Sequence, residues 1–236
     1  ATFIQSRILN RGKGPAVHSL RVQSDRVKYH TYMKYTLENT PNLYIKQAEV
    51  TAVDVENGRV TAVRTKLGAI HPVKAAIITT GTYLNGKIHI GELNYSSGPD
   101  NLLPSSGLTG CLKDLGVSMR RFKTGTPARV HKRSIDFSVM EKQSGDEQIM
   151  PFAFDNEQEL HKIVDCYVTY TNSETHKVIL ENLHRSPLYS GRIEGIGPRY
   201  CPSIEDKIVR FKDKERHQLF VEPMGLDTDE YYLQGM

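Results

Sequence analysis

Ala75-Ala-Ile-Ile-Thr-Thr80, followed by Gly81, is the stretch that decides the predicted fold class. A short continuous apolar run that ends at a glycine is typical of a strand buried on both faces of a parallel sheet. Thr79, Thr80 and Gly81 then lie at the carboxyl end of that strand, where open α/β sheets bind nucleotides. We therefore predict an α/β fold with a nucleotide near this turn. On these residues alone, a plain buried strand and turn remains the alternative.

The segment before this strand predicts a small antiparallel meander. Residues 43–55 are rich in β-forming side chains, and Glu56-Asn57-Gly58 is a hairpin signal of the Asn-Gly type. Residues 59–66 alternate basic and apolar side chains, and Leu67-Gly68 turns the chain again.

Two helices are predicted on either side of the meander. Ser24 can cap a helix that runs to about Glu38, with its tyrosines and Met33 in the core. Residues 108–115 place leucines and Cys111 on one helical face, which makes Cys111 a core residue.

The carboxyl-terminal half predicts further short elements. Cys166 to Tyr170 alternates like a strand, and 218–221 is a final strand. Thr171 and Glu174 form a capping box for a helix that runs to Leu183.

Composition excludes several classes of protein. The 236 residues suffice for one large or two small domains, and 38% hydrophobic with 25% charged residues is ordinary for a soluble globular chain. No apolar run approaches the ~20 residues that span a bilayer. The cysteines are Cys111, Cys166 and Cys201, with no CxxC spacing, so a disulfide framework or a metal site is not expected. A reducing cytoplasm is the expected compartment.

The net charge of +4 is mild, but the basic residues cluster. Seven fall within residues 120–133: Arg120, Arg121, Lys123, Arg129, His131, Lys132 and Arg133. This stretch is either a contact for phosphate or RNA or a basic, solvated loop.

The segment from Gly195 to Phe211 combines a glycine-proline loop with a helix start. Ser203 and Asp206 form an Asp variant of a capping box, and the apolar face expected for the helix runs from Ile204 to Phe211. A helix N-terminus suits a phosphate. The same field, with Arg199 close by, would favour the thiolate of Cys201.

A dinucleotide fingerprint is missing from the sequence. No GxGxxG opens a βαβ unit, and Gly195-Ile-Gly197 is followed by Pro198 and Arg199 instead of small residues. If a nucleotide binds, either much of its pocket lies elsewhere or the binding mode is atypical.

At the level of motifs, the chain resembles the MnmG (GidA) family, the flavoprotein subunit of the system that carboxymethylaminomethylates the wobble uridine of tRNA. The segments that carry the resemblance are Lys13–Val17, Gly81–Ile90, Arg121–Pro127, Ser134–Phe137, Gly145–Asp146, Arg185–Gly191, Gly197–Lys207 and His217–Pro223.

The resemblance implies that the chain is an internal fragment, a third to two-fifths of such a protein. Residues 1–126 would be part of a FAD/NAD(P)-binding, glutathione-reductase-like domain that contains the antiparallel meander but lacks the N-terminal GxGxxG unit. Residues 127–236 would be an inserted mixed α/β domain that binds NAD(H).

The resemblance also implies site residues. Flavin contacts fall on Val50, Thr80, Gly81 and Ser105, and Arg121, Lys123, Arg129 and Arg133 would lie near the pocket or the RNA. The span implied to bind the nicotinamide nucleotide is Gly197, Pro198, Arg199, Tyr200, Cys201, Pro202, Ser203, Ile204, Glu205, Asp206, Lys207, Ile208, Val209, Arg210 and Phe211.

The implied chemistry passes a hydride from NADH to FAD, which handles a one-carbon unit from methylenetetrahydrofolate. That unit and an amine are joined to the wobble uridine. Cys201 is the candidate nucleophile that activates the uracil ring, unless it packs the loop or lines the pocket. Asp206 is a candidate for proton transfer, although it already has a capping role.

The implied partners are tRNA, a MnmE-like GTPase and a second copy of the full-length protein. Two alternatives stay open: a flavin- and folate-dependent tRNA uridine methyltransferase resembling TrmFO, and a nucleotide- or RNA-binding module without catalysis.

Overall fold

The computed structural model describes residues 1–154, 160, 164–193, 195 and 203–235. The chain divides into two compact units. Unit 1 comprises residues 1–45, 125–180 and 202–236, and unit 2 comprises residues 46–124 and 181–201. The domain boundary near residue 126 remains a prediction.

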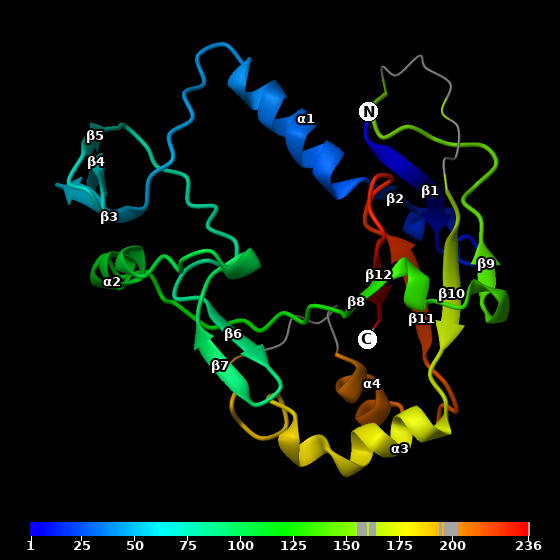
Figure 1. Ribbon diagram of the computed structural model, residues 1–236. Helices are drawn as coiled ribbons and strands as arrows, with labels where there is room; N and C mark the ends of the chain where they lie inside the picture. Colours follow the sequence, from blue (N-terminus) through cyan, green and yellow to red (C-terminus); the bar gives the residue numbers. More distant parts are fainter. Residues whose placement is uncertain (155–159, 161–163, 194, 196–202, 236) are drawn as a thin grey trace. The chain divides into compact units, whose positions relative to one another are not determined.

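Unit 1 is built on a five-stranded antiparallel sheet (Figure 1), in the order β8-β12-β11-β10-β9. Val221 lies at its centre, where it pairs with Tyr167 on one side and Leu233 on the other. Phe137 covers the sheet, with its ring centroid 4.5 Å from that of Tyr167. The strands are β8 (Arg129–His131), β9 (Glu141–Gln143), β10 (Cys166–Tyr170), β11 (Gln218–Pro223) and β12 (Glu230–Gln234).

A long hairpin joins this sheet in unit 1. Strands β1 (Phe3–Leu9) and β2 (Ser19–Ser24) pair antiparallel. The Gln5 side chain donates to the carbonyl of Gln143, the last residue of β9, at 2.9 Å. The Arg21 guanidinium meets the buried carboxylate of Glu222 on β11 at 2.7 Å. Neither strand of the hairpin was predicted.

Helix α1 (Arg26–Glu38) confirms the predicted helix but corrects its cap. Ser24 ends β2, and the carboxylate of Asp25 accepts from the backbone N–H of Lys28 at 2.9 Å. The prediction that this helix packs its tyrosines in a core is wrong for this chain, because none of its residues is buried.

Two further helices of unit 1 are α3 (Ser173–Glu181) and α4 (Ile204–Arg210), which Figure 1 shows at one end of the sheet. The cap predicted at Thr171 is wrong by one residue. The side chain of Asn172 accepts from the backbone N–H of Thr175 at 2.8 Å, whereas the Thr171 hydroxyl accepts from the backbone N–H of His217.

Unit 2 contains the predicted meander, which is confirmed. Strands β3 (Val50–Glu56), β4 (Arg59–Thr65) and β5 (Ile70–Pro72) pair in sequence order. Asn57 and Gly58 both have positive φ, as a tight hairpin turn between right-twisted strands requires.

Helix α2 (Gly107–Asp114) packs on β3 in unit 2. Leu108 and Leu112 form a small core with Val53, as the spacing of the leucines predicts. A separate hairpin, β6 (Lys87–Ile90) and β7 (Leu93–Ser96), completes the regular structure of this unit. The described 3₁₀ turns of the chain are η1 (Pro15–Val17), η2 (Pro99–Asn101), η3 (Lys132–Ser134), η4 (Phe137–Val139) and η5 (Leu183–Arg185).

The buried parallel strand predicted at residues 75–80 is absent from the structure of this chain. The segment forms no strand, and Ile77 is 90% exposed. A strand of this kind needs neighbours on both edges and layers on both faces. Among the described residues, the strand ladders are all antiparallel, and the sole parallel pairing is the bridge between Leu84 and Ser105.

Candidate functional site

Two of the positions predicted to contact flavin lie close together in unit 2. The backbone N–H of Tyr83 donates to the carbonyl of Thr80 at 3.2 Å, which closes the turn that contains Gly81. The N–H of Ser105 donates to the carbonyl of Tyr83 at 3.1 Å. The turn at the end of residues 75–80 is therefore held directly against Ser105.

Contacts of Glu49, the residue before Val50, place Val50 close to Ser105. The Glu49 carboxylate accepts from Lys66 Nζ at 2.9 Å, and this hydrogen bond lowers its pKa. The backbone N–H of Ser106 and the hydroxyl of Ser105 also donate to it. All the predicted flavin positions thus surround one region at the start of β3 and α2. Glu49 was not predicted from the sequence, because its hydrogen-bond partners Lys66, Ser105 and Ser106 are distant in the sequence.

Close backbone approaches shape this region. A β-carbon on Gly107 would lie 2.8 Å from the Thr51 side chain, so this side chain of β3 packs directly on the backbone of α2. A β-carbon on Gly98 would lie 2.8 Å from the Tyr83 ring. These glycines keep the loop that carries Ser105 tightly packed against the meander.

Helix α4 in unit 1 holds the described part of the predicted nicotinamide-nucleotide segment. The Ser203 hydroxyl accepts from the backbone N–H of Asp206 at 3.4 Å, which confirms Ser203 as the N-cap. Ile204 and Ile208 are buried, but the predicted apolar face does not extend to Phe211, whose side chain is 51% exposed. Residues 197–202, including Arg199 and Cys201, lie outside the described residues.

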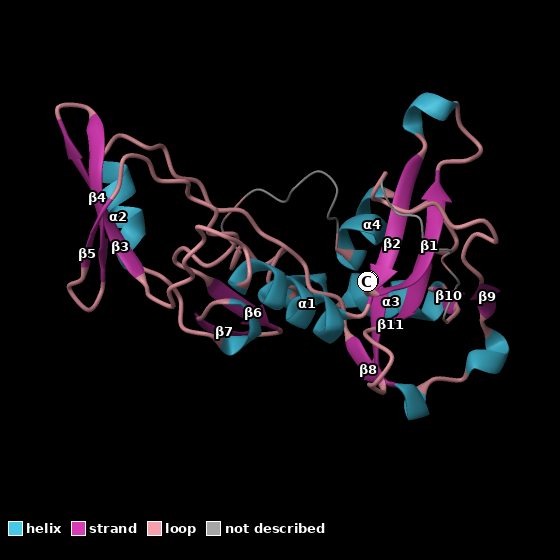
Figure 2. Cartoon of the chain, turned by 90° about the horizontal axis from the view of Figure 1, so that it is seen from above, coloured by secondary structure: helices cyan, strands magenta, loops and turns pink. Residues whose placement is uncertain are grey.

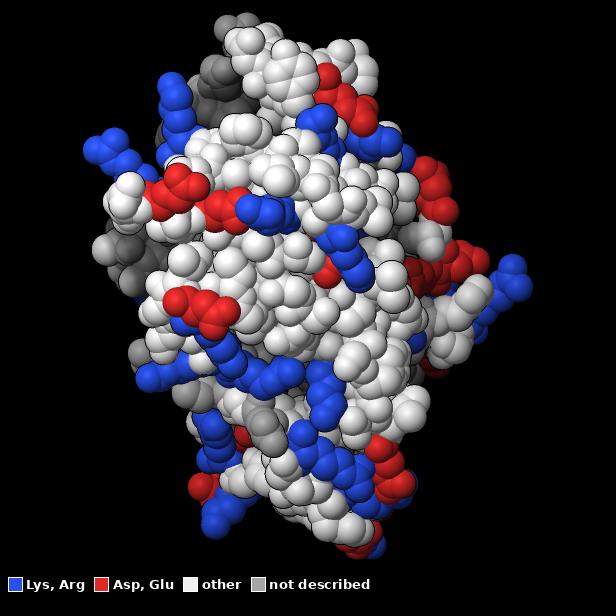
Figure 3. Space-filling model, turned by 90° about the vertical axis from the view of Figure 1, so that its left-hand side faces the viewer, with Lys and Arg blue, Asp and Glu red and all other residues white. Residues whose placement is uncertain are grey.

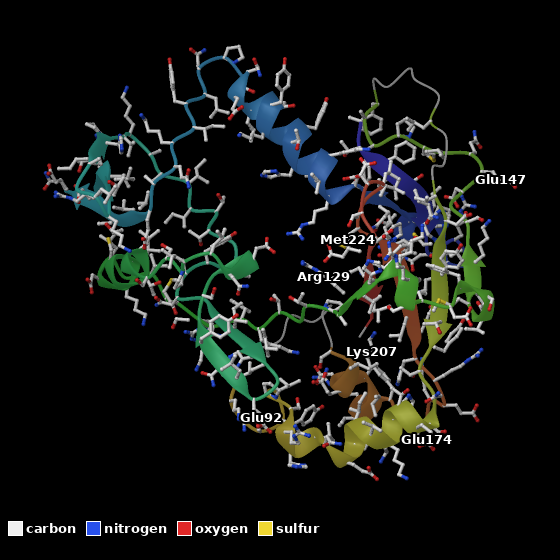
Figure 4. The ribbon with its side chains drawn as sticks, in the orientation of Figure 1. Glu92, Arg129, Glu147, Glu174, Lys207 and Met224 are labelled. Atoms are coloured by element: carbon white, nitrogen blue, oxygen red, sulfur yellow. The ribbon has the colours of Figure 1, made fainter. Side chains whose placement is uncertain are left out.

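The two charged side chains in the middle of α4 are both engaged. Asp206 is buried in the first turn, and Arg210 lies 3.8 Å from its carboxylate. Lys207 Nζ donates to the carbonyl of Gly235 at 2.6 Å, so Lys207 ties α4 to the end of β12 (Figure 4). A role of Lys207 in ligand binding would require it to leave this contact.

A buried histidine lies beside this helix and was missed by sequence reasoning. His217 is 7% exposed, and its Nε2 has no hydrogen-bond partner among the described residues. Its ring centroid is 5.4 Å from that of His176. Burial lowers the pKa of His217, and His176, Lys207 and Lys214 lower it further. Burial and these neighbours therefore disfavour protonation of the imidazole.

The four basic residues predicted near the pocket or the RNA divide between the units. Arg121 and Lys123 belong to unit 2, where the Arg121 guanidinium donates to the carbonyl of Asn85 at 3.1 Å. Arg129 and Arg133 belong to unit 1. Arg129, on β8 (Figure 4), lies 3.5 Å from the Glu230 carboxylate, whereas Arg133 is exposed.

Comparison with known proteins identifies the family. The family model described as glucose inhibited division protein A (GidA) matches residues 1–236. This chain belongs to the GidA family. Among curated relatives, it is 60% identical over 236 residues to the tRNA uridine 5-carboxymethylaminomethyl modification enzyme MnmG of Caldicellulosiruptor saccharolyticus. It is 59% identical over 235 residues to the MnmG of Clostridium botulinum.

Solved structures of GidA agree with this assignment. The chain matches Aquifex aeolicus GidA in two crystal forms, with TM-scores of 0.91 and 0.89 and identities of 50% and 46%. It is covered completely in both, but it spans 40% and 38% of those chains. The two curated relatives are likewise covered over 38% of their length. The predicted resemblance, the fold class and the expectation of a fragment are confirmed.

In this GidA-family chain, the two described cysteines have structural surroundings. Burial raises the pKa of the Cys166 thiol to about 12, and Glu222 adds to the effect. The Cys111 sulfur accepts from the backbone N–H of Val53 at 3.3 Å, between α2 and β3. Cys166 is therefore not an activated thiol of the kind predicted for Cys201.

Two negative findings concern the described part of the GidA-family chain. No group of three or more His, Cys, Asp or Glu side chains there could hold a metal ion. No described helix is long and apolar enough to cross a membrane.

Proposed function

We propose that this chain is part of a FAD-dependent enzyme that adds a carboxymethylaminomethyl, or aminomethyl, group to the wobble uridine of certain tRNAs. The observation that carries the proposal is 60% identity, over the whole chain, to a relative named for that modification. Because the chain spans 38% of that relative, the activity is proposed for the full-length protein.

In this proposal, unit 2 forms one edge of the FAD site. Gly81 has φ +54° and open space where a β-carbon would lie, so the backbone of its turn is accessible to a ligand. Val50, Thr80 and Ser105 surround the same region. FAD, when bound, would accept a hydride from NADH and handle the one-carbon unit from methylenetetrahydrofolate. With no GxGxxG in the chain, the pyrophosphate is expected to bind elsewhere in the full-length protein.

The second part of the proposed site is the segment Gly197–Phe211, which would bind NAD(H). Cys201 is proposed as the nucleophile that adds to the uracil ring, because the described cysteines, Cys111 and Cys166, both serve packing. Asp206 is proposed as a group that moves a proton near that ring. Its burial in the first turn of α4, close in sequence to Cys201, supports this role.

Contact with tRNA is proposed for Arg121, Lys123, Arg129 and Arg133. A double variant, Arg129→Glu with Arg133→Glu, should weaken tRNA binding by the full-length protein and reduce its salt dependence. The matched control is Arg59→Glu on the β4 strand, far in sequence from this stretch. Unchanged affinity and salt dependence in the double variant would remove these residues from the proposed interface.

The deciding experiment is analysis of nucleosides in tRNA. A bacterial strain that lacks its own enzyme is complemented with the full-length protein, and its tRNA is digested and examined by mass spectrometry. Restored carboxymethylaminomethyl- or aminomethyluridine supports the proposal. Appearance of 5-methyluridine instead would favour the methyltransferase alternative. Binding of tRNA without any new nucleoside would favour a non-catalytic module.

The proposed partners are a MnmE-like GTPase and a second copy of the full-length protein, in the cytoplasm. Co-purification of the tagged full-length protein with such a GTPase, and its mass in solution, test these two expectations. A monomer that retains no GTPase would contradict both.

A further inference from the structure

The β1–β2 hairpin of unit 1 carries basic side chains and no acidic ones. Residues 3–24 contain Arg7, Arg11, Lys13, His18 and Arg21 but no Asp or Glu, although the chain holds 27 acidic residues in 236. A cluster of exposed cations with no carboxylate among them is a surface that a polyanion can bind.

Two of these cations hold the hairpin in place. Arg21 pairs with the buried carboxylate of Glu222 at 2.7 Å. Arg11 pairs with Asp146 at 2.9 Å, and the same carboxylate accepts from the backbone N–H of Ile8 at 2.7 Å. The Arg11 side chain nevertheless remains 57% exposed. Lys13 is exposed and has no acidic partner among the described residues.

The tip of the hairpin has a defined conformation although all of it is exposed. The backbone N–H of Lys13 donates to the carbonyl of Asn10 at 2.9 Å, and the Asn10 side chain donates across the tip to the carbonyl of Val17 at 3.1 Å. The His18 ring lies 3.2 Å from the carbonyl of Lys13. Figure 2 shows the 3₁₀ turn η1 beyond the ends of both strands. A preformed tip loses little conformational entropy when a ligand binds.

Neither the backbone angles nor the contacts at the tip require its two glycines. Gly12 and Gly14 lack positive φ, and a β-carbon on either would meet nothing within 4 Å. Gly14 has φ −62° and ψ 156°, which any residue adopts. Among the described atoms, no acceptor takes the backbone N–H of either glycine. Exposed backbone N–H groups beside a lysine can donate hydrogen bonds to phosphate oxygens.

We propose that residues 10–18, the tip of the β1–β2 hairpin, contact the phosphate backbone of RNA. Lys13 supplies the main charge, Arg11 a second one, and Gly12 and Gly14 permit close approach of the backbone. Val17 is the one large apolar side chain exposed at the tip, so docking into an apolar groove does not fit. The choice of RNA among polyanions rests on the proposed function.

The test uses the full-length protein and an unmodified tRNA transcript, with affinity measured by fluorescence anisotropy between about 50 and 200 mM salt. Lys13→Glu should weaken binding about three- to tenfold and reduce the slope of log K against log salt by about 1. Gly14→Ala should weaken binding without lowering the melting temperature. Lys177→Glu, on the exposed side of α3, is the control and should leave both quantities unchanged.

The outcomes separate this inference from the proposed function. If wild-type protein modifies uridine and Lys13→Glu keeps the affinity and slope of the wild type, the inference is wrong and the function stands. If Lys13→Glu weakens binding of polyglutamate but not of tRNA, the tip binds acidic protein segments and the inference is again wrong. If tRNA affinity falls as expected but no modified nucleoside ever forms, the contact stands and the proposed function fails.

Discussion

At the residue scale, the proposed chemistry depends on one thiol. Cys201→Ser in the full-length protein should lower uridine modification by about 10³-fold or more, because a serine hydroxyl is a far weaker nucleophile without a base. Cys111→Ser is the matched control, since a hydroxyl can accept the hydrogen bond that the Cys111 sulfur takes from Val53. Modification is measured as modified nucleoside per tRNA over time. Activity retained by Cys201→Ser would exclude the nucleophilic role.

His217 makes a second prediction at this scale. Its pKa is lowered in the folded protein, whereas an unfolded histidine titrates near pH ~6.5. Between the two pKa values the unfolded chain binds more protons, so the free energy of unfolding falls as pH decreases. Stability is thus full above pH ~6.5 and is lost as pH falls toward the lowered pKa.

The measurement is the urea midpoint of the full-length protein at about pH 7.5 and about pH 5. His217→Gln removes the titrating group, so its midpoint should change less between the two pH values than that of the wild type. His184→Gln, at an exposed position, should behave like the wild type. Identical pH effects in the two variants would show that His217 does not contribute.

At the element scale, the contact between α2 and β3 makes a prediction about stability. Gly107→Ala should destabilise unit 2 by about 1–3 kcal/mol, because its β-carbon would overlap the Thr51 side chain. Gly110→Ala, in the same helix, meets open space and should stabilise by up to about 1 kcal/mol through helix propensity. Denaturant unfolding followed by circular dichroism measures both. Equal effects of the two substitutions would contradict the contact.

Elements with local signals were predicted well. The Asn57-Gly58 hairpin needs two residues that tolerate positive φ, and α2 needs leucines at helical spacing, so both follow from adjacent residues. The cap of α1 is set by the contact of Asp25 with Leu226, more than 200 positions away, which no local pattern contains. The β1–β2 hairpin was missed because the contacts that hold it, from Gln5 to β9 and from Arg21 to β11, join residues far apart in the sequence.

The residues of the candidate site also fall into two groups, those with a local sequence signal and those whose surroundings are made by distant residues. Ser203 as a cap follows from its distance to Asp206, and Ser105 with the Thr80–Gly81 turn followed from family resemblance. Glu49 and His217 were missed because their environments are made by distant residues. For Glu49 these are Lys66 and Ser105, and for His217 they are His176 and Lys207. Spacing along a sequence cannot report such contacts.

At the scale of the whole molecule, the chain exposes surfaces that its composition would normally bury. Ile77 is 90% exposed and Leu103 85%, both in unit 2. Figure 3 shows that charged side chains of both signs are interspersed with uncharged residues on one face. Large exposed apolar areas mark surfaces that another part of a protein covers. Because the chain spans about two-fifths of its GidA relatives, we expect the remainder of the full-length protein to cover them.

Hydrogen exchange tests this expectation at residues 75–80. In the chain by itself these amides form no strand ladder, so they should exchange rapidly. In the full-length protein we expect the segment to become the buried parallel strand that its sequence predicts, with amides protected by neighbouring strands. The amides of β4, which pair within this chain, should be protected in both and serve as the internal control. Equally rapid exchange of residues 75–80 in the full-length protein would mean that the apolar run is a loop in the complete enzyme too. The Thr80–Gly81 turn would then lack the strand end that makes it a nucleotide site.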